Sequence, residues 1–125
     1  MPTLSETLSE LARLLPERVK LQTDEKGNQF WYVWVRLNGG HWALIGSVSK
    51  HHALLPTEPG AVSLQLAMCQ ECEARGWEWR ISRSYMDYNA EVWPVATKDG
   101  HYGDSTDSAA HALASALAQA LEARQ

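Results

Sequence analysis

The run Gln29–Leu37, which reads QFWYVWVRL, restricts the fold more than any other part of this sequence. It puts four aromatic residues into five successive positions. Alternate side chains of a strand point to opposite faces. One face then receives Trp31, Val33, Val35 and Leu37, and the other receives Phe30, Tyr32, Trp34 and Arg36. A fold that contains this strand must place something against two largely apolar faces, so the question is what covers each of them.

The chain has 125 residues, which suits a single domain over 1–125, with a candidate sub-boundary in the irregular stretch 47–59. Its 45% hydrophobic and 21% charged content is that of a soluble globular protein. A net charge of −4 argues against a nonspecific binder of nucleic acid or of anionic membranes. No apolar run is long enough to span a membrane, and the first residues lack a basic secretory signal, so we expect a cytoplasmic protein with reduced thiols.

Hydrophobic periodicity predicts the element order α-ββ-α-ββ-α. The expected helices lie at 4–15, 58–75 and 107–123, and the expected hairpin strands at 29–37, 41–48, 77–86 and 91–97. Val19–Thr23 is either a short strand or an extended lead-in, and 98–107 is a polar loop. The sequence therefore predicts an α+β fold in which an antiparallel sheet of about four or five strands packs with three helices.

Local signals set several element ends. Thr3 and Glu6 fit a capping box, and Pro16 stops the first helix. Gly76 suits the left-handed position just past the second helix. Pro94 cannot donate a ladder hydrogen bond, so its strand is expected at an edge or a bulge.

Two groups of residues could carry chemistry, and we assign both a structural role. Cys69 and Cys72 form a CxxC inside a predicted helix, where they fall in the apolar arc and are expected to be small core side chains. A second group could hold a metal or act in a small metal-dependent enzyme: His101, Asp104, Asp107 and His111. The simpler account is that Asp107 or Ser105 caps the last helix and that His111 lies on its polar face with Ser115, Gln119 and Glu122. We therefore predict no metal, no cofactor and no catalytic residues.

We expect the face with Trp31, Val33, Val35 and Leu37 to be the core side. Three explanations remain for the face formed by Phe30, Tyr32, Trp34 and Arg36. Helices could cover both sides of the sheet, making a three-layer sandwich, and this is the explanation that we favour. A second subunit could cover the face, since Tyr, Trp and Arg are enriched at interface centres. Bases of a single-stranded nucleic acid could stack on it, although no RNA-binding motif is present.

The second half of the chain resembles a known family. From Leu66 onward it reads as a helix ending ARGW, a tryptophan-rich hairpin (WEWRIS…EVWPVAT), a polar loop and the helix DSAAHALASALAQALEA. This order is similar to that of the phage ABA sandwich domain, and the matching part is 66–123. The resemblance implies a phage- or prophage-type protein with no established catalytic residues.

Together these observations predict a non-catalytic protein that acts by protein–protein contact, with a separate protein or a second copy of itself as partner. The first hairpin would be the contact surface, with Tyr32 and Trp34 as anchors and Arg36 as a polar partner. The alternatives are the metal-dependent enzyme and the single-strand nucleic-acid binder.

Overall fold

The computed structural model describes residues 3–23, 30–38, 40–49, 58–85, 87–94, 99–105 and 108–124. Over these residues the chain forms three helices and two three-stranded antiparallel sheets, so the α+β class is confirmed. The elements are α1 (Leu4–Leu14), β1 (Val19–Thr23), β2 (Phe30–Arg36), β3 (Trp42–Ser49), α2 (Glu58–Arg75), β4 (Glu78–Arg83), β5 (Tyr88–Trp93), β6 (His101–Ser105) and α3 (Ala109–Glu122). Most of the suggested sub-boundary at 47–59 lies outside the described residues.

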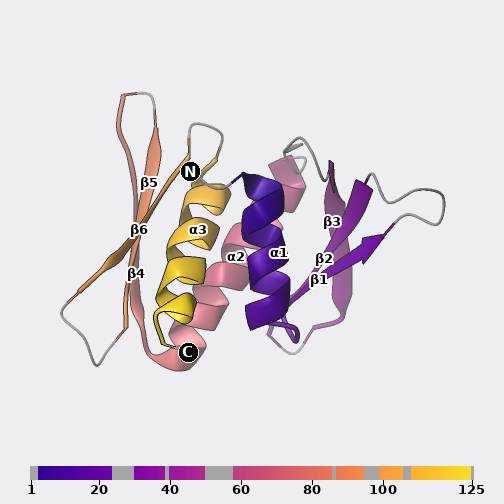
Figure 1. Cartoon of the computed structure of the whole chain (residues 1–125), viewed down its shortest axis with the longest axis horizontal. Coiled ribbons are helices and arrows are strands. Elements are labelled where there is room, and N and C mark those ends of the chain that lie inside the picture. The colour runs from indigo at the N-terminus through magenta and orange to yellow at the C-terminus, as the bar shows by residue number, and fades with distance from the viewer. Residues whose placement is uncertain are drawn as a thin grey trace.

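The helices form the middle layer of the molecule, and one sheet lies on each side of them (Figure 1). α3 packs on β5 and β6, α1 packs on β1, and α2 contacts both sheets. The expected single sheet of four or five strands is wrong, because each hairpin pairs with a third strand nearby in sequence, β1 or β6, and not with the other hairpin. Two small sheets that share one helical layer bury the apolar stripes of all three helices.

The first sheet has the order β1-β2-β3. Val33 and Val35 are fully buried against the helices, as the alternation in QFWYVWVRL predicted, while Leu37 is half-buried. The register between β2 and β3 shifts after Val33, so Val33 lies opposite Gly46 and Trp34 lies opposite Leu44. The extra residue is Ile45, which is buried, and Gly46 takes a φ of 154° that other residues rarely adopt.

The second sheet has the order β4-β5-β6, and its third strand is a correction to the sequence prediction. We expected a polar loop over 98–107, but His101–Ser105 pairs along β5 in register, with Ala90 opposite Gly103. β5 begins at Tyr88 rather than at the expected Glu91, and it is a central strand, so its expected place at an edge or a bulge is also wrong. Pro94 falls just after the last paired residue, Trp93, where it removes no hydrogen bond from the ladder.

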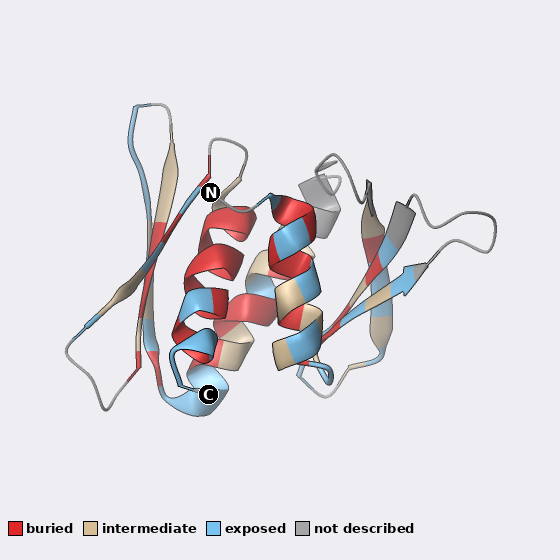
Figure 2. Cartoon of the chain, viewed as in Figure 1, coloured by how far each residue is buried: buried red, intermediate tan, exposed pale blue. Residues whose placement is uncertain are grey.

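The helix α3 is the centre of the core and is buried from Ala110 to Ala118 (Figure 2). It approaches β6 so closely that a Cβ atom on Gly103 would lie 2.6 Å from the backbone nitrogen of Ala116. The small alanine side chains of α3 permit this approach. Over its first two turns α3 has packed neighbours on all sides, so the polar face that we expected there is buried.

Two details of α3 correct the sequence prediction. His111 and Ser115 are 4% and 5% exposed, because β6 passes along the side of the helix that we expected to face water. Gln119 and Glu122, further along, are exposed as expected. The N-cap is Ser108, whose hydroxyl accepts a 3.1 Å hydrogen bond from the His111 amide, rather than Asp107 or Ser105.

The other helix ends follow their local sequence signals. Thr3 and Glu6 form the predicted capping box, with the Glu6 amide donating to the Thr3 hydroxyl at 3.2 Å. α1 ends at Leu14, two residues before Pro16. Gly76 has a φ of 72°, as predicted, and lets the amides of Gly76 and Trp77 reach the last carbonyls of α2. In the described residues, no helix is both long and apolar enough to cross a membrane.

Candidate functional site

The side of the first sheet that faces away from the helices carries the residues that the sequence singled out. Strand pairing places Tyr32 beside Gln22 and Ser47, Trp34 beside Lys20 and Leu44, and Arg36 beside Trp42. We call this set the outer β1–β3 face: Lys20, Gln22, Tyr32, Trp34, Arg36, Trp42, Leu44 and Ser47. Phe30 belongs to β2, but its side chain lies outside the described residues.

This face is open to solvent. Tyr32 is 41% exposed and Leu44 is 52% exposed, while Trp34 and Trp42 are half-buried. We favoured helices on both sides of this sheet, and that expectation is wrong for the described chain, in which all three helices lie between the two sheets. The physical reason is that the helical stripes find their second partner in the sheet β4–β6, so no helix remains for the outer β1–β3 face.

Side-chain contacts hold the aromatic groups of this face in place. The Lys20 ammonium lies 4.9 Å from the ring centre of Trp42 and 5.4 Å from that of Trp34, within the range of cation–π attraction. The Trp34 indole N–H donates to the Gln22 side-chain carbonyl at 3.1 Å. The Arg36 Nε donates to the Gly40 carbonyl at 3.3 Å. Two tryptophan rings and both cations of the face are thus held by contacts within it.

The charges of the outer β1–β3 face have one sign. Lys20 and Arg36 are its two charged members, and none of its eight described residues carries a carboxylate. The whole chain has a net charge of −4, so this face differs in sign from the protein that carries it. Such a local field attracts acidic groups.

The four residues of the alternative metal site do not come together in the described chain. His101 lies on the helix side of β6, whereas Asp104, three residues later, points to the opposite side. His111 is buried at the start of α3, where its Nδ1 is 3.2 Å from the Ser105 hydroxyl. Asp107 lies outside the described residues. Among the described residues, no group of three or more His, Cys, Asp or Glu side chains could hold a metal ion.

The two cysteines lie in the core, as the helical wheel predicted. Cys72 is fully buried and Cys69 is 8% exposed, and both thiols are free. Burial raises the pKa of Cys72 to about 12 and also raises the pKa of Cys69. A thiol with so high a pKa is a poor nucleophile and a poor metal ligand at neutral pH, so the arrangement supports packing rather than redox chemistry.

A groove of about 740 Å³ runs between α1 and α3. Its rim carries Glu6, Glu10 and Glu122, and His101 also borders it. Arg13 pairs with both Glu10 and Glu122. The hydrogen bond to Glu10 raises the pKa of Glu122, while the hydrogen bond to Arg13 lowers the pKa of Glu10. The two carboxyl groups therefore behave as a surface pair that one guanidinium holds together.

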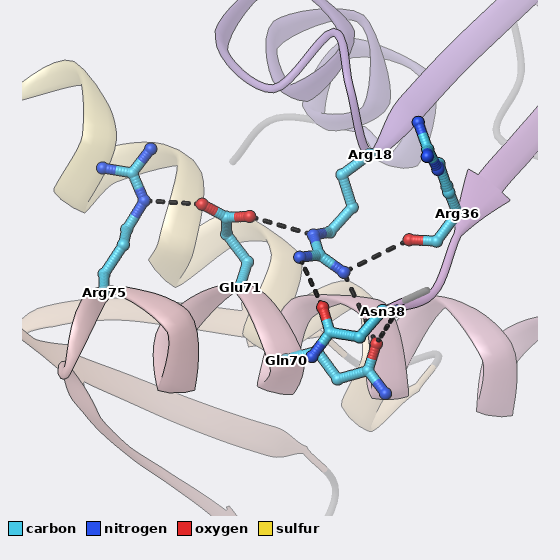
Figure 3. A network of polar contacts seen from close by, with 6 residues as sticks. All are labelled: Arg18, Arg36, Asn38, Gln70, Glu71 and Arg75. Carbon is cyan, nitrogen blue, oxygen red and sulfur yellow. Dashed lines mark hydrogen bonds and ion pairs between the residues drawn. The ribbon is translucent and has the colours of Figure 1, made fainter. Parts of the chain in front are cut away.

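A second feature, which the sequence reasoning missed, is a cleft of about 490 Å³ at the ends of α1, β2 and α2. Three arginines border it, and we call it the arginine cleft: Arg18, Arg36 and Arg75. Figure 3 shows Arg18 at its centre, with Arg75 on one side and Arg36 on the other. Arg18 precedes β1, Arg36 ends β2 and Arg75 ends α2, so residues distant in sequence meet here.

Arg18 and Glu71 form the partly buried floor of the arginine cleft. The Arg18 Nε donates to the Glu71 carboxylate at 2.9 Å, and the two side chains are 14% and 13% exposed. The remaining nitrogens of Arg18 donate to the Arg36 backbone carbonyl, the Gln70 side-chain carbonyl and the Asn38 side-chain carbonyl. Every Arg18 side-chain nitrogen therefore has an acceptor, and the residue joins the start of β1 to β2 and α2. Its separation from Glu71 along the chain left no local signal by which the pair could be found.

No protein-family model, curated protein or solved structure matches this chain. The resemblance of 66–123 to the phage ABA sandwich domain therefore stays a prediction.

Proposed function

We propose that this chain is a non-catalytic binding protein that holds an acidic protein partner on the outer β1–β3 face. The observation that carries the proposal is the exposure of Tyr32 and Leu44, 41% and 52%, next to two half-buried tryptophans on a sheet face without a covering helix in the described chain. Adjacent exposed apolar side chains rimmed by polar ones mark interaction surfaces. We keep the phage- or prophage-type origin within this proposal on the family resemblance alone.

The composition of the face supports a protein as the partner. Trp, Tyr and Arg are the residues that contribute most at the centres of protein interfaces, and Tyr32, Trp34 and Arg36 lie side by side on one strand face. The contacts of Lys20 and Gln22 already hold the Trp34 ring, so binding would order few further side chains. A surface that is preorganised in this way suits contact with another folded protein.

The charge of the face supports a partner that is acidic and different from this chain. A two-fold symmetric dimer through this face would bring together two copies of the same face, each of which carries Lys20 and Arg36. No described residue of the face supplies a carboxylate to offset that repulsion. A partner with Asp or Glu side chains would pair with both cations instead, which favours association and correct orientation.

Site-specific photo-crosslinking tests the proposal. A photoreactive amino acid would replace Leu44 in one sample and Tyr102 in another, and both would be exposed to extract of the source cells. Tyr102 is the matched control, because it is also exposed, at 60%, but lies on the sheet β4–β6. We expect one acidic protein to be joined at position 44 and not at position 102. Equal adducts at both positions, or none at position 44, would refute the proposal.

Binding of the purified partner would then be measured by calorimetry. Leu44→Glu should weaken the affinity for the acidic partner at least about tenfold. It places a negative charge opposite the negative charges of the partner, and it removes an apolar contact. Tyr102→Ala should leave the affinity unchanged. Sedimentation velocity of the chain alone should show a monomer at tens of micromolar. A dimer that dissociates into monomers on Leu44→Glu substitution would show instead that a second copy occupies the face.

Single-strand nucleic acid is the second candidate for this face, because rings beside Lys20 and Arg36 also suit stacked bases and phosphates. The position of the Lys20 ammonium over Trp34 and Trp42 weighs against it, since a base would have to displace that contact to stack there. Titration with oligonucleotides, followed by tryptophan fluorescence, decides between the two. Quenching that weakens steeply with salt would favour nucleic acid, and an unchanged signal would exclude it.

A further inference from the structure

The second sheet also has a side that faces away from the helices, and no helix of the described residues covers it. Strand pairing gives the members of this side, and we call the set the outer β4–β6 face: Glu78, Arg80, Ser82, Asn89, Glu91, Trp93, Tyr102 and Asp104. The residues that alternate with them, such as Ala90, Val92 and Gly103, are buried towards the helices. The molecule therefore presents a sheet face to solvent on each side of its helical layer (Figure 1).

Contacts within the outer β4–β6 face hold the side chains at its centre. The Glu91 side chain on the central strand is 7% exposed, and its carboxylate accepts a 3.1 Å hydrogen bond from Arg80 Nη2. The Arg80 guanidinium also lies 5.4 Å from the ring centre of Trp93. A hydrogen bond to Glu91 raises the pKa of Tyr102. Tyr102 and Arg80 are nevertheless exposed, so this cluster is held in place and still faces solvent.

The charge of the outer β4–β6 face is opposite in sign to that of the outer β1–β3 face. Its charged members are three carboxylates, Glu78, Glu91 and Asp104, against the one guanidinium of Arg80, so its net charge is −2. Arg80 neutralises the buried Glu91. The excess negative charge therefore lies on Glu78 and Asp104, which are both exposed and occupy opposite corners of the face.

We propose that the outer β4–β6 face binds a second protein partner, which presents Lys or Arg side chains to Glu78 and Asp104. The residues at its centre, Arg80, Trp93 and Tyr102, are of the types that contribute most at the centres of protein interfaces. Acidic groups at the rim favour association with a basic protein and fix its orientation.

This site does not depend on the outer β1–β3 face. If both faces bind, the chain joins an acidic protein to a basic one across the helical layer, and that bridge rests on the function proposed above for the outer β1–β3 face.

A second copy of this chain matches the outer β4–β6 face poorly, although its outer β1–β3 face has the opposite sign. Glu78 and Asp104 lie two strands and four residues apart, which is about 17 Å at ordinary strand spacings. Lys20 and Arg36 lie one strand and two residues apart, which is about 8 Å. The cations of one copy are therefore too close together to lie opposite both acids of another. A separate protein with more widely spaced cations suits the face better.

Site-specific photo-crosslinking identifies the partner. A photoreactive amino acid would replace Ser82 in one sample and Arg83 in another, and both would be exposed to extract of the source cells. Arg83 is the matched control, because it is also an exposed residue of β4 but points to the other side of the strand. We expect a basic protein to be joined at position 82 and not at position 83. No adduct at position 82, equal adducts at both positions, or an adduct with this chain itself overturns the proposal.

Calorimetry with the purified basic protein then separates specific binding from general charge attraction. The double variant Glu78→Lys/Asp104→Lys should weaken the affinity at least about tenfold, because it places cations opposite those of the partner. The control Glu17→Lys/Glu73→Lys changes the net charge by the same amount at two exposed residues away from the face, and it should weaken the affinity less than about threefold. Equal losses in the two double variants would overturn the proposal.

Two single substitutions complete the test. Tyr102→Ala removes a central contact without changing the charge, so it should also weaken the binding of the basic protein about tenfold. Leu44→Glu, on the opposite sheet, should leave this affinity unchanged, even if the outer β1–β3 face proves to bind nothing. Loss of the basic protein with Leu44→Glu but not with Tyr102→Ala would place it on the outer β1–β3 face and overturn the proposal.

Discussion

The substitution Gly103→Ala tests the central packing contact of this fold. A methyl group at Gly103 would meet the carbonyl oxygen of Ala112, the backbone nitrogen of Ala116 at 2.6 Å and the Cβ of Ser115 at 2.9 Å. The first two are backbone atoms of α3, which cannot move aside by a change of rotamer. The helix must therefore shift away from β6, and α3 also packs against α1, α2 and β5.

The cost of this shift follows from overpacking and from chain entropy. Forcing one extra carbon into a packed core costs about 1–3 kcal/mol, and a rigid backbone neighbour puts this case near about 3 kcal/mol. Replacing glycine by alanine in a strand also raises the free energy of unfolding by about 0.5–1 kcal/mol, because alanine restricts the unfolded chain. The net loss in the free energy of unfolding is therefore about 2 kcal/mol.

Urea denaturation followed by tryptophan fluorescence measures this loss. With a slope of about 2 kcal/mol/M, the midpoint should fall by about 1 M while the slope stays unchanged. Gly100→Ala is the matched control. Its methyl group would meet the side chains of Glu91 and Trp93, the latter at 2.7 Å from Nε1. Side chains can turn away, so its midpoint should fall by less than about 0.5 M.

A Gly103→Ala variant as stable as the wild type, or no less stable than Gly100→Ala, would show that α3 does not lie so close to β6. That result would contradict the central place of α3 in the core.

Three further predictions address other contacts. Glu71→Gln removes the carboxylate that pairs with the partly buried Arg18 and should cost about 2 kcal/mol in urea denaturation. Arg13→Ala, whose partners are about half exposed, should lower the urea midpoint much less than Glu71→Gln, and equal falls in the midpoint would contradict the assigned role of Glu71. Cys72, with its pKa raised to about 12, should not react with a thiol reagent at pH 8 until the protein unfolds; rapid labelling of the native protein would refute its burial. The pKa of Glu122 is raised above 4.5 in the folded chain, so its contribution to stability is present at low pH and is lost as the pH rises through the folded pKa. The Tm advantage of Glu122→Gln over the wild type should therefore be larger at pH 7 than at pH 4, and a difference independent of pH would contradict the Glu10–Glu122 hydrogen bond.

Local chemistry in the sequence was sufficient for most helix and strand assignments. The capping box at Thr3, the stop before Pro16 and the left-handed Gly76 act within a few residues, so they can be recognised without knowing the rest of the fold. The alternation in QFWYVWVRL likewise identified Val33 and Val35 as core residues. It also placed Tyr32, Trp34 and Arg36 together on the opposite face of one strand.

The strand β6 could not be predicted from local signals of this kind. Its residues on the helix side, His101, Gly103 and Ser105, are not an apolar series, so the segment reads as a polar loop. It is a strand because α3 lies against it at a distance that Gly103 permits. The contact between a small strand residue and an alanine-rich helix can be predicted only when the two elements are already known to be neighbours.

The amino-acid sequence by itself determined the helices, the presence of two hairpins and the two faces of the aromatic strand, because these depend on the spacing of residues near one another. Only the tertiary structure decided that the hairpins belong to separate sheets, that the helices lie between them, and that no helix of the described residues covers the outer β1–β3 face. It also brought Arg18 to Glu71, which lies in another part of the chain. Such pairings depend on which surfaces bury one another, and that is a property of the whole chain.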